Sequence, residues 1–229
     1  MSRMSIKSRL VASFTGIIAV LVIALLLLVF VSYKSTLDDE LRKNGRVNIS
    51  ELSLELVNWF APRMQQLETF ESLLSSGVCL TPRDLLPAFK MQMTRDAETT
   101  SIYYCTRQHY RKGGDFVDGS DWVPDADYDP YSRDWWLQAA TNSGTVFVQP
   151  YVDAQTKKVV VTLARRVERG GDLLGVIAVD LYLTHLDSIV SNKKHSPNAK
   201  TWLVDPRGLF ITHQQQDHVL KKAFLMIPC

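Results

Sequence analysis

The chain has 229 residues, of which 46% are hydrophobic and 22% are charged, and its formal net charge is +2. This is the composition of an ordinary globular protein of one or two domains, and it excludes an intrinsically disordered chain. Three of the 26 Lys and Arg residues (Arg3, Lys7 and Arg9) precede residue 33, so the remaining 23 are balanced by 24 acidic residues. Nucleic-acid binding would need a basic surface, so no nucleic-acid partner is expected.

The first predicted element is a transmembrane helix over residues 10–32. This stretch carries no charged residue, and about 20 apolar residues are enough to span the bilayer core. A cleaved signal peptide is the alternative, but its apolar part is usually shorter, and Val31-Ser32-Tyr33 is a poor cleavage site. Basic residues precede the helix and acidic residues follow it. Residues 1–9 are therefore predicted to be a cytoplasmic tail of an inner-membrane protein, with residues after about 33 periplasmic or extracellular.

A long stalk helix is predicted over residues 33–76. Apolar residues recur there at spacings of three and four, which is typical of one buried helix face. They are Leu52, Leu56, Trp59, Phe60, Met64, Leu67, Phe70, Leu73 and Leu74. Gly45 and Pro62 are expected to interrupt or kink the helix. Thr81-Pro82 is typical of a helix start and predicts a second helix that extends to about Thr94.

From residue 98 the pattern changes to runs of β-branched and aromatic residues separated by turn-forming segments. Strands are predicted over residues 100–105, 145–152, 158–167 and 173–183, with a short fifth strand at 115–117. A helix over residues 183–192 follows. The order of helices and strands predicts an α+β fold with one mostly antiparallel sheet, in a module of residues 77–192.

Residues 193–229 are predicted to begin a second, smaller module. In TWLVDPRGLFITH, two short strands would be joined at Pro206-Arg207-Gly208, and the chain ends soon afterwards at LMIPC. A two-stranded hairpin alone is marginally stable in water. The expectation is therefore an incomplete protein: a fragment, a truncated product or a degraded copy.

Enzyme chemistry has little support in the sequence. There is no GxSxG motif, and the five histidines fall in predicted turns, helix ends or the last strand, so neither an enzyme nor a cofactor is expected. The acidic residues between Asp115 and Asp129 raise a calcium hypothesis, but they lack the order of an EF-hand loop, and a solvated loop is favoured. Cys79 and Cys105 could form a disulfide in an oxidising compartment or stay as buried thiols.

The segment YDPYSRDWW, residues 128–136, has an unusual density of aromatic rings beside one arginine. Arg133 could bind a carboxylate through its planar fork of donors, and Trp135 and Trp136 could form apolar walls. Tyr151 and Asp180 fall near the ends of later strands and could bind an ammonium group together with Tyr128. A zwitterion needs one partner for its carboxylate and another for its ammonium group. The alternative is an internal Arg133–Asp180 salt bridge, with the tryptophans as core.

YDPYSRDWW, VFVQPYVDAQTKKVVVTLARRV and LLGVIAVDLYL together resemble the double-Cache sensor domain of bacterial methyl-accepting chemotaxis proteins, and WLVDPRGLFITH resembles the start of its second module. The amino-acid-binding branch carries the pattern Y-x4-R-x-W-Y, followed by a spaced Tyr and Asp. This sequence matches it at Tyr128, Arg133 and Trp135, and at the spaced Tyr151 and Asp180. Directly after Trp135, where the pattern has tyrosine, this sequence has Trp136.

The resemblance implies PAS-like modules in a homodimer that binds a small zwitterionic or amine solute and signals across the membrane. It implies that Arg133, Trp135 and position 136 hold the ligand carboxylate. Tyr128, Tyr151 and Asp180 would hold the amino group, with Asp153 as a further ammonium contact. Three alternatives stay open: the sensor of a histidine kinase or a cyclic-di-GMP enzyme, an unliganded structural or interaction domain, and a truncated remnant that does not signal.

Overall fold

The computed structural model describes residues 6–77, 81–192, 200–213 and 215–223. Its contacts divide the chain into two units, residues 1–51 and 52–229. Cys79 and Cys229 lie outside the described residues, and Cys105 is a free, buried thiol.

The first unit consists of the early part of helix α1 (Ile6–Ser75). Among the described residues, α1 is the one helix that is long and apolar enough to cross a membrane, and its apolar side chains around Phe14–Tyr33 are all exposed. Exposing this many apolar side chains is favourable in a lipid bilayer and unfavourable in water. Gly45 and Pro62 do not end the helix, because α1 continues through both positions.

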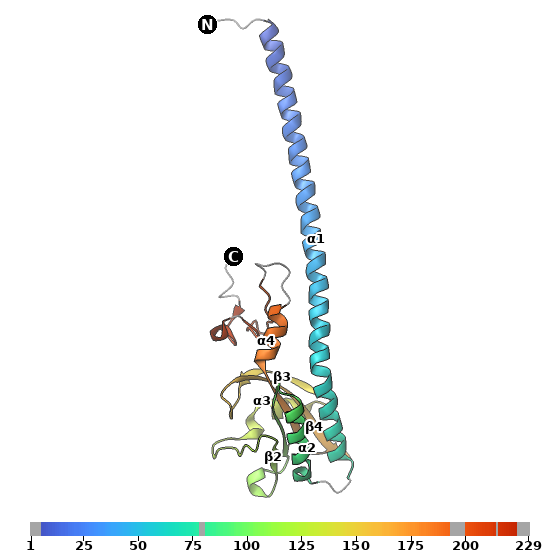
Figure 1. The fold of residues 1–229 in the computed structure, drawn as a ribbon, viewed down its shortest axis with the longest axis vertical. Coiled ribbons are helices and arrows are strands. Elements are labelled where there is room, and N and C mark those ends of the chain that lie inside the picture. Colours follow the sequence, from blue (N-terminus) through green and yellow to red (C-terminus); the bar gives the residue numbers. More distant parts are fainter. Residues whose placement is uncertain (1–5, 78–80, 193–199, 214, 224–229) are drawn as a thin grey trace. The chain divides into compact units, whose positions relative to one another are not determined.

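The second unit is built on an antiparallel sheet (Figure 1), which has five strands in the order β2-β1-β5-β4-β3. The strands are β1 (Thr99–Thr106), β2 (Phe116–Asp118), β3 (Val146–Val152), β4 (Val159–Arg169) and β5 (Asp172–Tyr182). All five predicted strands are confirmed, with small shifts at their ends. Gly170 and Gly171, both with positive φ, form the tight β4–β5 turn that the sequence predicts.

Helices α2 (Leu86–Arg95), α4 (Leu183–Asn192) and the part of α1 in this unit pack on one face of the sheet. Leu67, Phe89 and Leu186 from these helices are buried against strand residues such as Ile177 and Val179. The predicted helix after Pro82 is present, although its first turn is a 3-10 turn (Pro82–Leu85) and α2 follows it. The predicted bounds of α4 agree with the structure.

The opposite face carries helix α3 (Asp134–Thr141), whose Trp135, Trp136 and Ala139 pack on Val176 and Ala178. Successive strand residues point to opposite faces, so β5 supplies both cores in alternation. The sequence interpretation missed α3 because it treated the aromatic segment as a loop. This helix matters for the site, since its N-cap residue is Arg133.

The C-terminal hairpin is less regular than predicted. Instead of two paired strands there is an isolated bridge between Val204 and Phe210. The Asp205 carboxylate accepts hydrogen bonds from the backbone N–H groups of Arg207 and Leu209, both at 2.8 Å, and so holds a tight turn in place of a ladder. Val219 belongs to the same core as the helices on the first face of the sheet. That residues 193–229 begin a second module stays a prediction.

Candidate ligand-binding site

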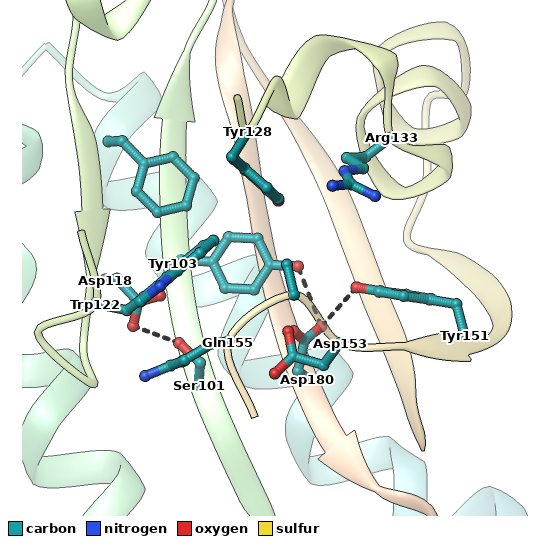
Figure 2. A pocket seen from close by; sticks show the side chains of 12 residues that line it. Ser101, Tyr103, Asp118, Trp122, Tyr128, Arg133, Tyr151, Asp153, Gln155 and Asp180 are labelled. Atoms are coloured by element: carbon teal, nitrogen blue, oxygen red, sulfur yellow. Dashed lines mark hydrogen bonds between the residues drawn. The ribbon is translucent and has the colours of Figure 1, made fainter. Parts of the chain in front are cut away.

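A narrow hollow opens on the α3 face of the sheet, between the segment after β2 and the turn after β3 (Figure 2). The empty space inside the hollow, measured out to its mouth, is about 370 Å³. The part of this space in which the centre of a water molecule fits is only about 20 Å³. By the second measure there is room for about one water molecule, so a solute has to widen the hollow as it binds. Its lining residues are Ser101, Tyr103, Phe116, Asp118, Trp122, Tyr128, Arg133, Tyr151, Asp153, Ala154, Gln155 and Asp180.

The register of the sheet arranges polar side chains in one row across the floor of the hollow. Asp180 of β5 lies opposite Ser101 of β1 on one side and Thr162 of β4 on the other. Cross-strand partners share a face of the sheet, so these side chains point the same way. The Ser101 hydroxyl in turn donates a hydrogen bond of 2.5 Å to Asp118, at the end of β2. The row therefore runs Asp118, Ser101, Asp180, Thr162.

Asp180 is only 4% exposed, and its Oδ1 atom accepts hydrogen bonds from Thr162 Oγ1 (2.5 Å), Tyr103 Oη (3.1 Å) and Tyr151 Oη (3.4 Å). No described Lys or Arg forms an ion pair with it. Burial raises the pKa of Asp180 to about 7, and the charge of Asp153 acts in the same direction, while the Thr162 hydrogen bond opposes them. Ionising a buried carboxylate without a cation costs free energy, so a bound ammonium group would stabilise Asp180 in its charged form.

Two more carboxylates line the hollow. Asp153 Oδ2 accepts hydrogen bonds from the backbone N–H and the hydroxyl of Thr156, both at 2.6 Å, which hold the turn after β3. Asp118 Oδ1 accepts from Ser101 and from Ser120, and burial raises the pKa of Asp118. Like Asp180, neither carboxylate has an ion pair with a described residue. Three buried carboxylates without cations favour a positively charged ligand.

Arg133 lies at the opposite wall of the hollow, before α3, with its guanidinium group 4.7 Å from the centre of the Tyr128 ring. This side chain is exposed and makes no hydrogen bond or ion pair with any residue that the structure describes. The alternative of an internal Arg133–Asp180 salt bridge is therefore wrong. The guanidinium donors remain available to an anionic group.

Tyr151 reaches the hollow because of a β-bulge in β3. Val148 pairs with Thr162 and Tyr151 with Val160, so β3 has one more residue than β4 over this stretch. The extra residue brings Tyr151 onto the same face as Val148, although regular alternation would place it on the other. Burial, and then the Asp180 charge, raise the pKa of Tyr151, and burial also raises the pKa of Tyr128. Both rings therefore stay neutral phenols.

The two tryptophans lie outside the main hollow. Trp135 is 1% exposed and packs edge-on against Tyr103, with ring centres 5.1 Å apart. It lines a neighbouring depression, which has an empty volume of about 460 Å³, together with Arg133 and Tyr151. Trp136 lines neither space and instead packs edge-on against Tyr131, with ring centres 4.6 Å apart. Adjacent helix residues point about 100° apart, and of these two side chains only Trp135 lines one of the two spaces.

Sequence reasoning brought together five residues that do line the hollow: Tyr128, Arg133, Tyr151, Asp153 and Asp180. It missed Ser101 and Tyr103 on β1, for which the alternation of that strand was the available signal. It also missed Trp122, and it assigned Asp118 to a solvated acidic loop. Among the described residues no group of three or more His, Cys, Asp or Glu is placed to hold a metal ion, so the calcium hypothesis finds no site.

Residues 64–188 match the family model described as methyl-accepting chemotaxis protein-like, first PDC sensor domain. The chain is 30% identical over 196 residues to the methyl-accepting chemotaxis protein TlpB of Bacillus subtilis, which covers 83% of this chain and 28% of TlpB. It is 25% identical over 197 residues to PctB of Pseudomonas aeruginosa, which covers 86% of this chain and 29% of PctB. The chain thus spans less than a third of the length of these curated relatives.

Solved structures show the same fold. The ligand-binding domain of the Pseudomonas fluorescens chemoreceptor CtaA, in complex with L-serine, aligns with a TM-score of 0.66 and 20% identity over 78% of this chain and 75% of that chain. The corresponding domain of Pseudomonas aeruginosa PctC, in complex with GABA, aligns with a TM-score of 0.64 and 24% identity over 80% and 79%.

These matches confirm the predicted α+β sensor fold and the expectation of a sensor in place of an enzyme, and with the apolar helix they indicate a membrane-anchored protein. By the match over more than half of its length, the chain belongs to the family of methyl-accepting chemotaxis protein-like first PDC sensor domains.

Proposed function

We propose that this chain is the extracytoplasmic ligand-sensing part of a chemoreceptor, and that its hollow binds the amino group of a small amino-acid-like solute. The observation that carries the proposal is Asp180, a buried carboxylate with three hydrogen-bond donors, no cationic partner and a free arginine at the opposite wall. A zwitterion would supply an ammonium group to Asp180 and a carboxylate to Arg133.

In this arrangement the ligand ammonium group donates to Asp180 and Asp153, whose unused carboxylate oxygens accept no hydrogen bond from a described residue. The ligand carboxylate accepts from Arg133, which is suited to bidentate binding. Tyr128 and Tyr151 stay neutral and form the sides between these two poles. We do not assign a ligand contact to Trp136, and Trp135 is a positioning residue that packs beneath Tyr103.

The relatives support this assignment. The similar structures are described as amino-acid chemoreceptor domains with L-serine, GABA or, for PctB, L-Arg, all of which carry both an amino group and a carboxylate. No observation on this chain favours a histidine kinase or a cyclic-di-GMP enzyme as the output.

Strand β4 offers a physical connection from the site to helix α1. It carries Thr162 in the polar row and, further along, Arg165 and Arg169. Arg165 Nη1 lies 3.4 Å from Glu68 Oε1, and Arg169 Nη2 donates a hydrogen bond of 2.8 Å to the Leu74 carbonyl at the end of α1. A ligand that binds one arrangement of this strand more tightly shifts the population of α1 positions. We expect α1 to carry this shift to a span at residues 10–32, in contact with lipid and within a homodimer.

The test is calorimetric titration of the full chain in lipid nanodiscs with L-serine, GABA, L-lysine and L-arginine. Binding of at least one probe is expected, and Asp180→Asn should weaken it about 100-fold, because it removes the charge that pairs with the ammonium group. Asp172→Asn, on the exposed first residue of the same strand, is the matched control and should leave affinity unchanged. A folded chain that binds none of these probes would contradict the proposal, as would normal binding by Asp180→Asn.

A further inference from the structure

The end of the hollow away from Arg133 is built from a carboxylate and aromatic rings. Asp118 lies there, 6% exposed, one strand beyond Ser101. Phe116 and Trp122 pack edge-on with ring centres 5.9 Å apart, and Trp122 packs edge-on at 4.9 Å against Tyr128, the ring that also contacts Arg133. All four side chains line the same space (Figure 2 labels Asp118, Trp122 and Tyr128).

The charge of Asp118 is not needed to hold its own turn. Its Oδ1 atom accepts all of its hydrogen bonds, from the hydroxyl of Ser101 and from the N–H and hydroxyl of Ser120. Its Oδ2 atom accepts none from a described residue. An asparagine could accept the same hydrogen bonds, so the negative charge has no structural partner among the residues that the structure describes.

Aromatic faces beside a carboxylate favour a cation. The negative faces of Trp, Tyr and Phe attract ammonium and guanidinium groups, and the attraction is stronger where water is excluded. The aromatic rings thus support the same conclusion as the charge of Asp118, and they do so by an independent effect.

The spacing separates this end from the α-amino site. Asp118 is on β2 and Asp180 on β5, with β1 between them, so the strands that carry the two carboxylates are about 10 Å apart at about 4.8 Å per strand spacing. One ammonium group cannot contact both carboxylates. A ligand with a second positive group on a flexible side chain can do so.

From this geometry we infer that the ligand is a basic amino acid, with its α-ammonium group at Asp180 and Asp153 and its side-chain ammonium or guanidinium group at Asp118, beside the rings of Phe116 and Trp122. The inference rests on the proposed function and adds the chemical class of the ligand. It makes Asp118 a specificity-determining residue.

The experiment compares L-lysine with norleucine, which lacks the terminal ammonium group, by calorimetry on the full chain in nanodiscs. Wild type should bind lysine about tenfold to hundredfold more tightly than norleucine, the range expected of a charge-assisted hydrogen bond. Asp118→Asn should remove most of this preference by weakening lysine alone. Asp121→Asn is the matched control: the same change, three residues away, on a carboxylate that pairs with Lys90 and does not line the hollow.

Equal affinity of wild type for lysine and norleucine would overturn the inference, while norleucine binding itself would still support the proposed function. A loss of the same size for both probes in Asp118→Asn would also overturn it, because the effect would then be on the site as a whole. Cadaverine, which is lysine without its carboxylate, should bind more weakly than lysine. If it binds as tightly as lysine, the ligand class is a diamine and the inference of a basic amino acid is overturned.

Discussion

The two faces of one sheet have different chemistry. On the face covered by α1, α2 and α4, strand residues such as Ile177, Val179 and Leu181 are fully buried in an apolar core. On the other face, the same strand places Ala178 under α3 and then Asp180 in the polar hollow. The comparison shows how an antiparallel strand of period two can stabilise a fold with one set of side chains and recognise a ligand with the other. The first face should determine stability and the second should determine binding.

The largest expected effect concerns the apolar face. Phe89 of α2 is fully buried and packs edge-on against Phe70 with ring centres 5.0 Å apart. Phe89→Ala should lower the free energy of unfolding by about 3–5 kcal/mol, because it leaves a cavity. Denaturant unfolding of the chain in detergent measures this loss, and Met91→Ala on the exposed side of α2 is the control. If folded Phe89→Ala had lost its ligand selectivity, this would contradict the claim that the first face determines stability and the second determines binding.

Asp180→Asn should have the opposite effect on stability. The pKa of Asp180 is about 7 in the folded chain and near 3.8 when unfolded, so the folded state binds more protons between these values and stability falls as the pH rises through them. At pH 8 the neutral variant should therefore be more stable than wild type by about 4 kcal/mol, and at pH 4 the difference should vanish. Unfolding curves at both pH values measure it. A variant that is less stable at pH 8 would show that the charge helps the unliganded fold.

Ligand affinity should depend on pH. Asp180 must be ionised to pair with an ammonium group, so binding is favoured above pH 7 and weakens as the pH falls through it. Affinity at pH 6 should be about tenfold lower than at pH 8. Asp118 also lines the hollow, and burial raises its pKa, so its protonation would act in the same direction. Calorimetry at the two pH values checks this, with Asp121→Asn expected to keep the wild-type profile. Stronger binding at pH 6 would assign the ligand contact to a different group.

The smallest effect is expected at Trp136, the position where the family resemblance has tyrosine. Because Trp136 packs on Tyr131 and does not line the hollow, Trp136→Tyr should change affinity by less than about threefold and cost about 1 kcal/mol of stability from lost packing. The same titrations measure it. A tenfold gain in affinity would mean that residue 136 contacts the ligand after all.

Sequence patterns predicted the sheet and the helices on its first face well, since apolar alternation and paired glycines signal strands and turns directly, but they did not reveal α3. The predicted bounds of α4 agree with the structure, and each of the five strands is present. The hairpin at residues 201–213 is less regular than the prediction of two paired strands. The Asp205 carboxylate binds the backbone N–H groups of Arg207 and Leu209, and no apolar pattern reveals such a contact.

The site was predictable only in part, because long-range register decides which polar residues meet. The resemblance supplied Tyr128, Arg133, Tyr151 and Asp180, but the bulge that turns Tyr151 toward the hollow cannot be read from period-two alternation. Asp118 looked like one of several loop acids until the structure paired it with Tyr103 of β1, where it accepts a hydrogen bond from Ser101. The resemblance also supplied Trp135 and Trp136 as ligand contacts; the structure places Trp135 at the neighbouring depression and Trp136 against Tyr131.

The most direct test of the central claim is a crystal structure of the chain with the tightest-binding probe of the calorimetric panel. The account predicts the probe's amino nitrogen at hydrogen-bonding distance from Asp180, about 2.7–3.2 Å, with its carboxylate against Arg133. A probe bound with its carboxylate toward Asp180 would contradict it. So would a probe bound anywhere other than in this hollow.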